Sequence, residues 1–401
     1  MKKTKFRKPN FFVYGVFRLA SKFLSKFMFK VKVTKNEVRG KKGSYVIIAN
    51  HEASIDFIAL AAAVKRRINF VISNSFYQSL NIQPLIKACG VIPKQQFQTR
   101  TSDLKSMKRV VENGGVLGIY PAGLMSENGV STAIPKASGK LLKWLDSDVY
   151  VAYISGTYLT SPKWSDTRRK GKVKLSITKL LSAEEIKNMD VENITNLVEE
   201  KLRYNAYETQ EKERVIYKHG DNIEGLEKVL YKCPKCGSEF SIKSKSKNKL
   251  ECNTCGNEAK SDKYGFLEKV KESDVIYKYP NEWYDYIQEH VLEEVKNNPY
   301  YFIQSHAKIK MIDYKKHKFV FVGDANIKLD KEKFTISGNI NGEEILKEVS
   351  IATFPMLPFK PGVHFEIQDG MDIYRIILDK SKEVMKWVMS LKALFTLYHN
   401  K

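Results

Sequence analysis

The sequence predicts an α/β domain with a mixed sheet, followed by a small cysteine-containing module and an α+β domain. Three observations support this order. Short apolar runs alternate with helical stretches from Lys41 to about Thr160, four cysteines cluster between positions 233 and 255, and several strand-like runs follow one another within residues 264–401. A chain of 401 residues is long enough for two or three domains.

The first domain, which we place at residues 33–220, alternates predicted strands with predicted helices. Its strands are expected at 45–49, 69–72, 91–92, 116–120 and 149–154, with one more at 172–178. Its helices are expected at 57–65, 84–88, 102–112 and 136–145, and residues 182–217 also have helical spacing. This alternation is typical of a largely parallel sheet with helices on its faces.

The N-terminal segment combines positive charge with apolar bulk. The chain has a formal net charge of +23, and residues 1–50 hold 14 Lys/Arg and one acidic residue, which is 14 − 1 = +13. Arg18, Lys22, Lys26 and Lys30 recur every four residues among many apolar side chains. This pattern predicts a basic amphipathic helix over residues 1–32 that lies on an anionic membrane surface. The alternative is an amphipathic helix that packs only on its own domain.

Neither a membrane-spanning helix nor a signal peptide fits this segment. The longest uncharged run, Pro9–Phe17, is far shorter than the ~20 residues that a spanning helix needs. Charges interrupt the apolar region, and no clear small-residue cleavage site follows. We therefore expect a peripheral protein.

Four cysteines have the spacing of a metal site. Cys233 and Cys236 form one C-x2-C pair and Cys252 and Cys255 form a second, with 15 residues between the pairs. This spacing predicts a zinc ribbon at residues 229–260, in which four thiolates hold a structural zinc ion and leave no open coordination position. Reduced cysteines of this kind indicate the cytoplasm. Cys89 lies in an apolar context and is expected to be a core thiol.

The last domain, at residues 264–401, is expected to be α+β. A helix at 282–294 precedes strand-like runs at 302–312, 318–322, 333–336, 344–351, 363–368 and 373–378, and a final helix covers about 381–398. Antiparallel strands followed by one C-terminal helix is the order of a pleckstrin-homology-like (PH-like) barrel.

The segment Asn50–Asp56 carries the strongest functional signal. His51 directly follows the apolar run Tyr45–Ala49, and Asp56 comes five positions later at the start of the next predicted helix. In open α/β sheets, ligands bind at the carboxyl ends of strands, where His51 is expected to lie. A histidine oriented by an aspartate can remove a proton from a hydroxyl group. The alternative is a helix-capping aspartate beside a surface histidine.

Four stretches in order resemble one enzyme family. The Asn50-His51…Asp56 segment looks like the NHx4D block of the glycerolipid (1-acylglycerol-3-phosphate) acyltransferases. Gly90–Pro93 is similar to the second block of that family, and Tyr120–Ser126 lies where the family has Phe-Pro-Glu-Gly-Thr-Arg-Ser. Val149–Ala152 fits its late apolar strand. The resemblance covers roughly residues 30–180.

The resemblance implies a chemistry. His51 is the expected general base toward an acceptor hydroxyl, and Asp56 is expected to orient its imidazole. The acyl donor is a thioester of CoA or of acyl-carrier protein, and the acceptor is a lysolipid or a glycerol-type lipid. Amide groups near the helix start after His51 are candidates to stabilise the oxyanion. The enzyme is expected to act peripherally, at the cytoplasmic face of the membrane.

The third block retains part of the family pattern. Tyr120 and Pro121 keep the turn at the strand end, Gly123 keeps a position that tolerates close approach of backbone, and Ser126 matches the final serine. We expect this loop to bind substrate.

Departures from the family affect the acceptor site. Ala122 and Met125 stand where the family has a glutamate and an arginine associated with the phosphorylated acceptor. Loss of a guanidinium removes bidentate phosphate recognition, worth about 1.5–3 kcal/mol. Lys94 and Arg100 are the candidate replacement charges near the second block, with Lys105 and Lys136 as further options. The alternative is a catalytically inactive membrane scaffold with the same fold.

A zinc-ribbon protein that binds nucleic acid is a third interpretation of the +23 charge. It is disfavoured, because the charge is concentrated on the phenylalanine-rich N-terminal helix.

Overall fold

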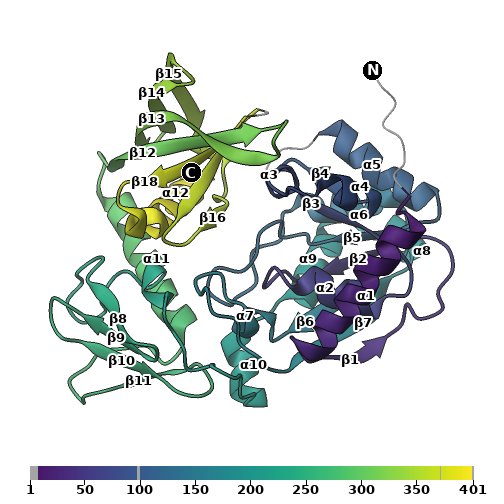
Figure 1. Cartoon of the computed structure of the whole chain (residues 1–401), viewed down its shortest axis with the longest axis horizontal. Helices are drawn as coiled ribbons and strands as arrows, with labels where there is room; N and C mark the ends of the chain where they lie inside the picture. The colour runs from purple at the N-terminus through teal and green to yellow at the C-terminus, as the bar shows by residue number, and fades with distance from the viewer. Residues whose placement is uncertain (1–7, 97–99, 371, 400–401) are drawn as a thin grey trace. The chain divides into compact units, whose positions relative to one another are not determined.

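The structure is a computed structural model that describes residues 8–96, 100–370 and 372–399 (Figure 1). The chain divides into two compact units. The first contains Met1–Tyr77, Ile82–Lys163 and Thr167–Gly220, and the second contains Gln78–Asn81, Trp164–Asp166 and Asp221–Lys401. Residues 1–7 of the predicted segment 1–32 lie outside the described residues.

The first unit is built on a mixed sheet with the strand order β1-β7-β6-β2-β5-β3-β4. Strands β6 and β7 are antiparallel, and the other neighbouring strands are parallel, which confirms the mixed sheet. The strands are β1 (Val31–Asn36), β2 (Tyr45–Ala49), β3 (Ile68–Ser73), β4 (Ile92–Lys94), β5 (Val116–Ile119), β6 (Val149–Ser155) and β7 (Val173–Leu181).

The helices of this unit lie mostly at the predicted positions, although those at Asn74–Gln78 and Thr157–Thr160 were not predicted. They are α1 (Phe11–Phe27), α2 (Asp56–Ala63), α3 (Asn74–Gln78), α4 (Gln83–Ala88), α5 (Thr101–Glu112), α6 (Ala137–Leu145), α7 (Thr157–Thr160), α8 (Ala183–Asn188), α9 (Val191–Leu202) and α10 (Ala206–Glu213). A capping box between Ser182 and Glu185 begins α8.

Strand β2 is central, and its alternate side chains enter two different cores. Tyr45, Ile47 and Ala49 pack in a cluster that includes side chains of α2, and Phe17 of α1 lies against that cluster. Val46 and Ile48 pack in a second cluster with side chains of α5, α6 and α9. This period of two places helices on both faces of the sheet (Figure 1).

Helix α1 exposes an apolar stripe. Its inward side carries Tyr14, Ser21 and Ser25, which are buried. Its exposed large apolar side chains are Phe11, Phe12, Val16, Leu19, Phe23 and Phe27. In the described part of the chain, no helix combines the length and the apolar character that crossing a membrane requires.

The second unit begins with a small antiparallel sheet of order β11-β10-β9-β8. Its strands are β8 (Ile242–Ser246), β9 (Lys249–Cys252), β10 (Glu258–Ser261) and β11 (Leu267–Lys269). The predicted boundaries at 229 and 260 stay predictions.

The rest of the second unit is a larger antiparallel sheet of order β15-β14-β13-β12-β18-β17-β16, with α11 before it in the chain and α12 after it. The elements are α11 (Pro280–Asn297), β12 (Phe302–Asp313), β13 (Lys318–Asp330), β14 (Lys333–Ile340), β15 (Glu343–Ser350), β16 (Phe359–Lys360), β17 (His364–Asp369), β18 (Asp372–Leu378) and α12 (Val384–His399). Short 3₁₀ turns lie at Leu226–Lys228, Ile351–Thr353 and Ser381–Glu383. The α+β class of this part is confirmed.

Candidate active site

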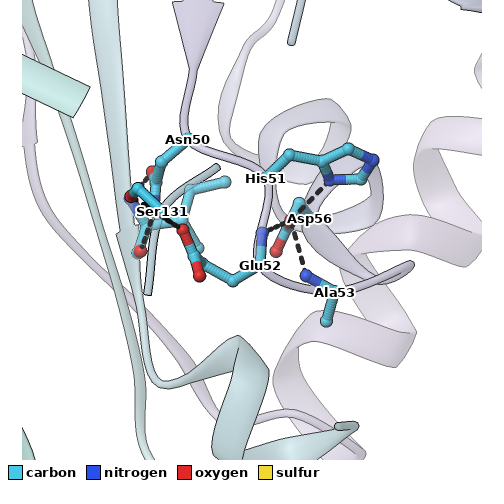
Figure 2. A network of polar contacts seen from close by, with 7 residues as sticks. Asn50, His51, Glu52, Ala53, Asp56 and Ser131 are labelled. Carbon is cyan, nitrogen blue, oxygen red and sulfur yellow. Dashed lines mark hydrogen bonds and ion pairs between the residues drawn. The ribbon is translucent and has the colours of Figure 1, made fainter. Parts of the chain in front are cut away.

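The candidate catalytic pair lies in the turn between β2 and α2. Nδ1 of His51 is 2.9 Å from Oδ2 of Asp56 (Figure 2). The side chain of Asp56 is fully buried, whereas that of His51 is 20% exposed. Figure 2 shows the other ring nitrogen of His51 pointing away from Asp56. The imidazole is therefore held on one side and accessible on the other.

Asp56 also organises the backbone of the turn. Its Oδ2 atom accepts hydrogen bonds from the amides of Glu52, at 2.8 Å, and Ala53, at 3.0 Å. These two amides are therefore engaged inside the loop, and oxyanion stabilisation by other amides near the helix start stays a prediction. Asp56 thus fixes both the imidazole and the loop that carries it.

Asn50 holds the loop against the neighbouring strand. Its Nδ2 atom donates to the carbonyl oxygen of Ile154 at 2.7 Å, and its Oδ1 atom accepts from the amide of Ile154 at 2.8 Å. Ile154 lies on β6 beyond the last residue pair of β2 and β6, which is Ala49 with Ala152. The Asn50 side chain therefore extends the strand pairing into the loop.

The loop after β5 packs against His51. The rings of Tyr120 and His51 are 4.5 Å apart and tilted by 32°. The hydroxyl group of Tyr120 is buried and has no hydrogen-bond partner among the described residues. Burial raises the pKa of Tyr120 well above its usual value, so the phenol stays neutral. Tyr120 thus supplies an apolar wall to the site.

The turn at Tyr120–Gly123 has the shape that the sequence suggested. The amide of Gly123 donates to the carbonyl oxygen of Tyr120 at 3.0 Å, and Gly123 has a φ of 72°, which favours glycine. Pro121 and Ala122 are half-buried in this turn. The role of Pro121 and Gly123 in substrate binding stays a prediction.

Ser126 joins this loop to the turn that carries His51. Its amide donates to the carbonyl oxygen of His51 at 3.0 Å. Its buried hydroxyl donates to the carbonyl oxygen of Val130 and accepts from the amide of Gly129, both at 2.8 Å. The hydroxyl of Ser126 is thus committed to the shape of its own loop, although the sequence placed it among the substrate-binding residues.

Lys94 and Arg100 make no hydrogen bond or ion pair with the candidate catalytic pair in the described part of the chain. Nζ of Lys94 donates to the carbonyl oxygen of Gln95 at 3.0 Å, and burial lowers the pKa of this lysine. Arg100 is half-buried and directly precedes α5. The proposed contact of Lys94 and Arg100 with the acceptor stays a prediction.

Sequence reasoning missed two residues, Glu52 and Ser131, that lie behind the candidate catalytic turn. Glu52 is 1% exposed, and its Oε1 atom lies 3.3 Å from Nδ2 of Asn50 and 3.3 Å from Oγ of Ser131. Figure 2 shows the side chain of Glu52 turned toward these residues and away from the His51 ring. Ser131 is 79 residues from Glu52 in the sequence, so no local signal could have connected them.

The four clustered cysteines have a geometry that fits zinc. Their sulfur atoms all lie within 4.8 Å of one another, with Cys233 3.7 Å from Cys255 and Cys236 3.8 Å from Cys252. A tetrahedral ion with zinc–sulfur bonds of about 2.3 Å separates its ligand atoms by about 3.8 Å. Oγ of Ser241 lies 3.2 Å from the sulfur of Cys252 and can stabilise its thiolate. The cluster can therefore hold a metal ion.

Comparison with known proteins agrees with the geometry. Residues 30–158 match the family model described as Acyltransferase, and this range contains His51, Asp56 and the Tyr120 loop. This part of the chain is therefore similar to an acyltransferase domain. A crystal structure of the 1-acyl-sn-glycerophosphate acyltransferase from Thermotoga maritima is also similar. It shares 19% sequence identity and a TM-score of 0.42, over 47% of this chain and 77% of that one.

Proposed function

We propose that this chain moves a fatty acyl group from a thioester donor to a hydroxyl group of a lysophospholipid or glycerol-type lipid. The observation that carries the proposal is the His51–Asp56 pair at the carboxyl end of β2. The donor is an acyl-CoA or an acyl-carrier protein, as the family resemblance implies. A buried carboxylate that holds a partly exposed imidazole is the arrangement that general-base chemistry requires.

The proposed mechanism uses the free ring nitrogen of His51. Nε2 removes the proton from the acceptor hydroxyl while the oxygen of that hydroxyl attacks the thioester carbonyl carbon. The tetrahedral intermediate then collapses, its carbon–sulfur bond breaks, and the departing thiolate takes the proton from the imidazolium. The charge of Asp56, held 2.9 Å from Nδ1, stabilises the imidazolium between these two steps.

The acceptor is proposed to differ from a simple lysophosphatidate. Ala122 and Met125 offer neither the carboxylate nor the guanidinium that the family resemblance places in this loop. At the second block, Gln96 donates from Nε2 to the carbonyl oxygen of Gly123 at 3.0 Å. The two loops are thus joined by a neutral hydrogen bond, and a phosphomonoester would find no bidentate partner at these positions.

Helix α1 is proposed to place the first unit on a membrane. Phe12, Val16, Leu19, Phe23 and Phe27 form a continuous exposed stripe along its outer side. Lys22 and Lys26 are also exposed beside this stripe. An apolar stripe flanked by lysines is the pattern of a helix that lies in the headgroup region of an anionic leaflet. We place this surface at the cytoplasmic face of the membrane, because the cysteine cluster implies reduced thiols.

The second unit is proposed to contain a structural zinc ribbon and a PH-like domain. Zinc is proposed as the metal, because four thiolates leave no open coordination position. The strand order of the larger sheet and the helix α12 that follows it support a PH-like topology.

The proposed activity is tested by acyl transfer on anionic vesicles. Labelled long-chain acyl-CoA and, separately, acyl-carrier protein are offered with a panel of lysolipids and glycerol derivatives. We expect His51→Ala to lower product formation by at least about a hundredfold, because it removes the base.

His306→Ala is the matched control. Nδ1 of His306 lies 3.0 Å from Oδ2 of Asp379, but both side chains are about half exposed. This variant therefore removes a similar pair outside the site and is expected to retain activity. Equal turnover by folded wild type and His51→Ala would show that the assigned base is wrong. Absence of product with every donor and acceptor, with protein bound to vesicles, would favour the inactive scaffold.

A further inference from the structure

Glu52 is a buried carboxyl group that the proposed mechanism does not use. Its backbone amide supports Asp56, but its side chain points the opposite way, toward Asn50 and Ser131 (Figure 2). No ion pair among the described residues involves Glu52. Its second carboxyl oxygen, Oε2, is buried without a hydrogen-bond partner among those residues. An ionised carboxylate is poorly supported in such surroundings.

Ser131 has only one hydroxyl hydrogen to give. Its Oγ atom lies 3.0 Å from the carbonyl oxygen of Leu202 and 3.3 Å from Oε1 of Glu52, and it accepts a hydrogen bond from the amide of Tyr204 at 2.9 Å. If the hydroxyl donates to the closer oxygen, that of Leu202, its remaining lone pair faces Glu52. A protonated Glu52 can then donate to Ser131, and every hydrogen in the group has an acceptor.

The electrostatics of the site point in the same direction. Burial, and then the nearby charge of Asp56, raise the pKa of Glu52 from its usual value of 4.5 to about 8. Asp56 needs its own charge to hold two amides and the imidazole, so a second buried anion beside it is unfavourable.

We propose that Glu52 is a positioning residue that acts as a neutral acid. It donates a hydrogen bond to Ser131. This bond holds the turn that carries His51 and Asp56 against the segment that contains Ser131. Ser131 in turn is bound to the end of α9 through Leu202 and Tyr204. The neutral acid therefore links the catalytic turn to an element far away in the sequence.

Ionisation of Glu52 would disturb this link in a defined way. A carboxylate at Glu52 competes with the carbonyl oxygen of Leu202 for the single hydroxyl hydrogen of Ser131. One of the two acceptors is then left without a donor, and repulsion from Asp56 is added. The effect on catalysis rests on the proposed function, but the protonation of Glu52 and its bond to Ser131 do not.

Other titratable groups near Glu52 do not obscure its titration. Besides Asp56 and His51 on the turn itself, Glu52 faces Tyr153 of β6 and Tyr204 after α9. Burial raises the pKa of Tyr153 to about 12 and that of Tyr204 well above its usual value. Both phenols therefore stay neutral through the range in which Glu52 loses its proton.

The first experiment measures protonation without any substrate. Infrared difference spectra of the full chain compare wild type with Glu52→Gln between pH 5 and pH 10. We expect wild type to show a carboxylic-acid carbonyl band near pH 7 that Glu52→Gln lacks and that disappears as the pH rises through about 8. Absence of this band at pH 7 would overturn the proposal.

In Ser131→Ala the band should disappear at a lower pH, because the acid has lost its hydrogen-bond acceptor. An unchanged midpoint of the titration of this band would contradict the bond to Ser131.

The second experiment measures stability. Glu52 keeps its proton up to about pH 8 in the folded chain but loses it near its usual value of 4.5 when the chain unfolds. The stabilisation is therefore complete below pH 4.5 and is lost as the pH rises to about 8. We expect the free energy of unfolding of wild type to fall relative to Glu52→Gln across this range. Glu199→Gln, a change at an exposed position on α9, should show the same pH dependence of the free energy of unfolding as wild type. Parallel curves for wild type and Glu52→Gln would refute the neutral acid.

The third experiment addresses catalysis. The kcat/KM of wild type should decline above about pH 8, whereas Glu52→Gln, which stays neutral, should rescue activity there. An identical decline of kcat/KM in wild type and Glu52→Gln would contradict the positioning role of Glu52. If no acyl transfer is found with any substrate, the proposed function fails, while the infrared and stability results still decide the state of Glu52.

Discussion

The side chain of Asn50 and the backbone of Ile154 exchange two hydrogen bonds, of 2.7 and 2.8 Å. This pair continues the ladder between β2 and β6 by one step after β2 itself has ended. The residue next to Asn50 is His51, so the position of the imidazole depends on this contact. A side chain therefore sets where the candidate catalytic turn leaves the sheet.

Replacing Asn50 should destabilise the first unit. Asn50→Ala leaves the buried amide and carbonyl oxygen of Ile154 without these partners, and each such loss costs about 1–3 kcal/mol. We expect the free energy of unfolding, measured in urea, to fall by about 2–4 kcal/mol. Asn188→Ala, at an exposed position in α8, is the control and should change it by less than about 0.5 kcal/mol. Equal effects of the two variants would contradict the role of Asn50.

Two variants of Asp56 should separate its charge from its hydrogen bonds. Asp56→Asn can place its carbonyl oxygen where Oδ2 accepts from His51, Glu52 and Ala53, but it carries no charge. We expect kcat to fall by at least about a hundredfold, because the imidazolium loses its counterion. Asp56→Ala also leaves the amides of Glu52 and Ala53 without an acceptor and should cost about 1–3 kcal/mol more stability than Asp56→Asn. Circular dichroism and urea unfolding check the second expectation, and equal stability of the two variants would contradict it.

The His51–Asp56 pair could be predicted because its geometry is local. A strand, a turn and a helix start lie within twelve residues, from Tyr45 to Asp56, and that short path brings the two side chains together. The contact of Glu52 with Ser131 could not be predicted, since it depends on how two distant loops pack. The sequence placed Ser126 in the expected substrate loop, but it gave no sign that the hydroxyl of Ser126 bonds to Gly129 and Val130 of the same loop.

Strand β13 shows why the C-terminal sheet was underestimated. The sequence predicted a strand that ends at Val322, and the residues that follow include the poor strand formers Gly323, Asp324 and Asn326. The strand continues to Asp330 because Ala325, Ile327 and Leu329 alternate into the core. Tertiary packing thus outweighed local propensity. In α1, by contrast, the sequence predicted an amphipathic helix with one side available to a membrane surface, and the phenylalanine side chains Phe12, Phe23 and Phe27 are exposed.

Membrane binding should depend on the exposed stripe of α1. Phe12→Ser and Phe23→Ser each remove a side chain that is more than half exposed in the structure. Full burial of one such side chain contributes about 1.5–3 kcal/mol, so each change should weaken binding to anionic vesicles by at least about tenfold. Flotation and sedimentation with vesicles measure this loss, which should persist at high salt.

Two further variants serve as controls for the vesicle binding of α1, one that changes a charge on the helix and one that changes an apolar side chain elsewhere. Lys22→Glu should weaken binding mainly at low salt, because salt screens the attraction to anionic lipid. Leu346→Ser changes an exposed apolar side chain on β15 of the second unit and should leave binding unchanged. If the phenylalanine variants bind vesicles as wild type does, α1 is not the membrane contact.

Zinc binding is expected to depend on each of the four clustered cysteines. Cys252→Ser removes one ligand of a tetrahedral set and should reduce bound zinc from about one ion per chain toward none. Since metal binding in such ribbons is coupled to folding, the segment around β8–β10 should become sensitive to protease. Cys89→Ala, a change at a buried cysteine in the apolar core of the first unit, should retain the metal. Full zinc content in Cys252→Ser, measured by atomic absorption, would exclude this cysteine as a ligand. Unchanged protease resistance after verified zinc removal would exclude a structural role for the metal.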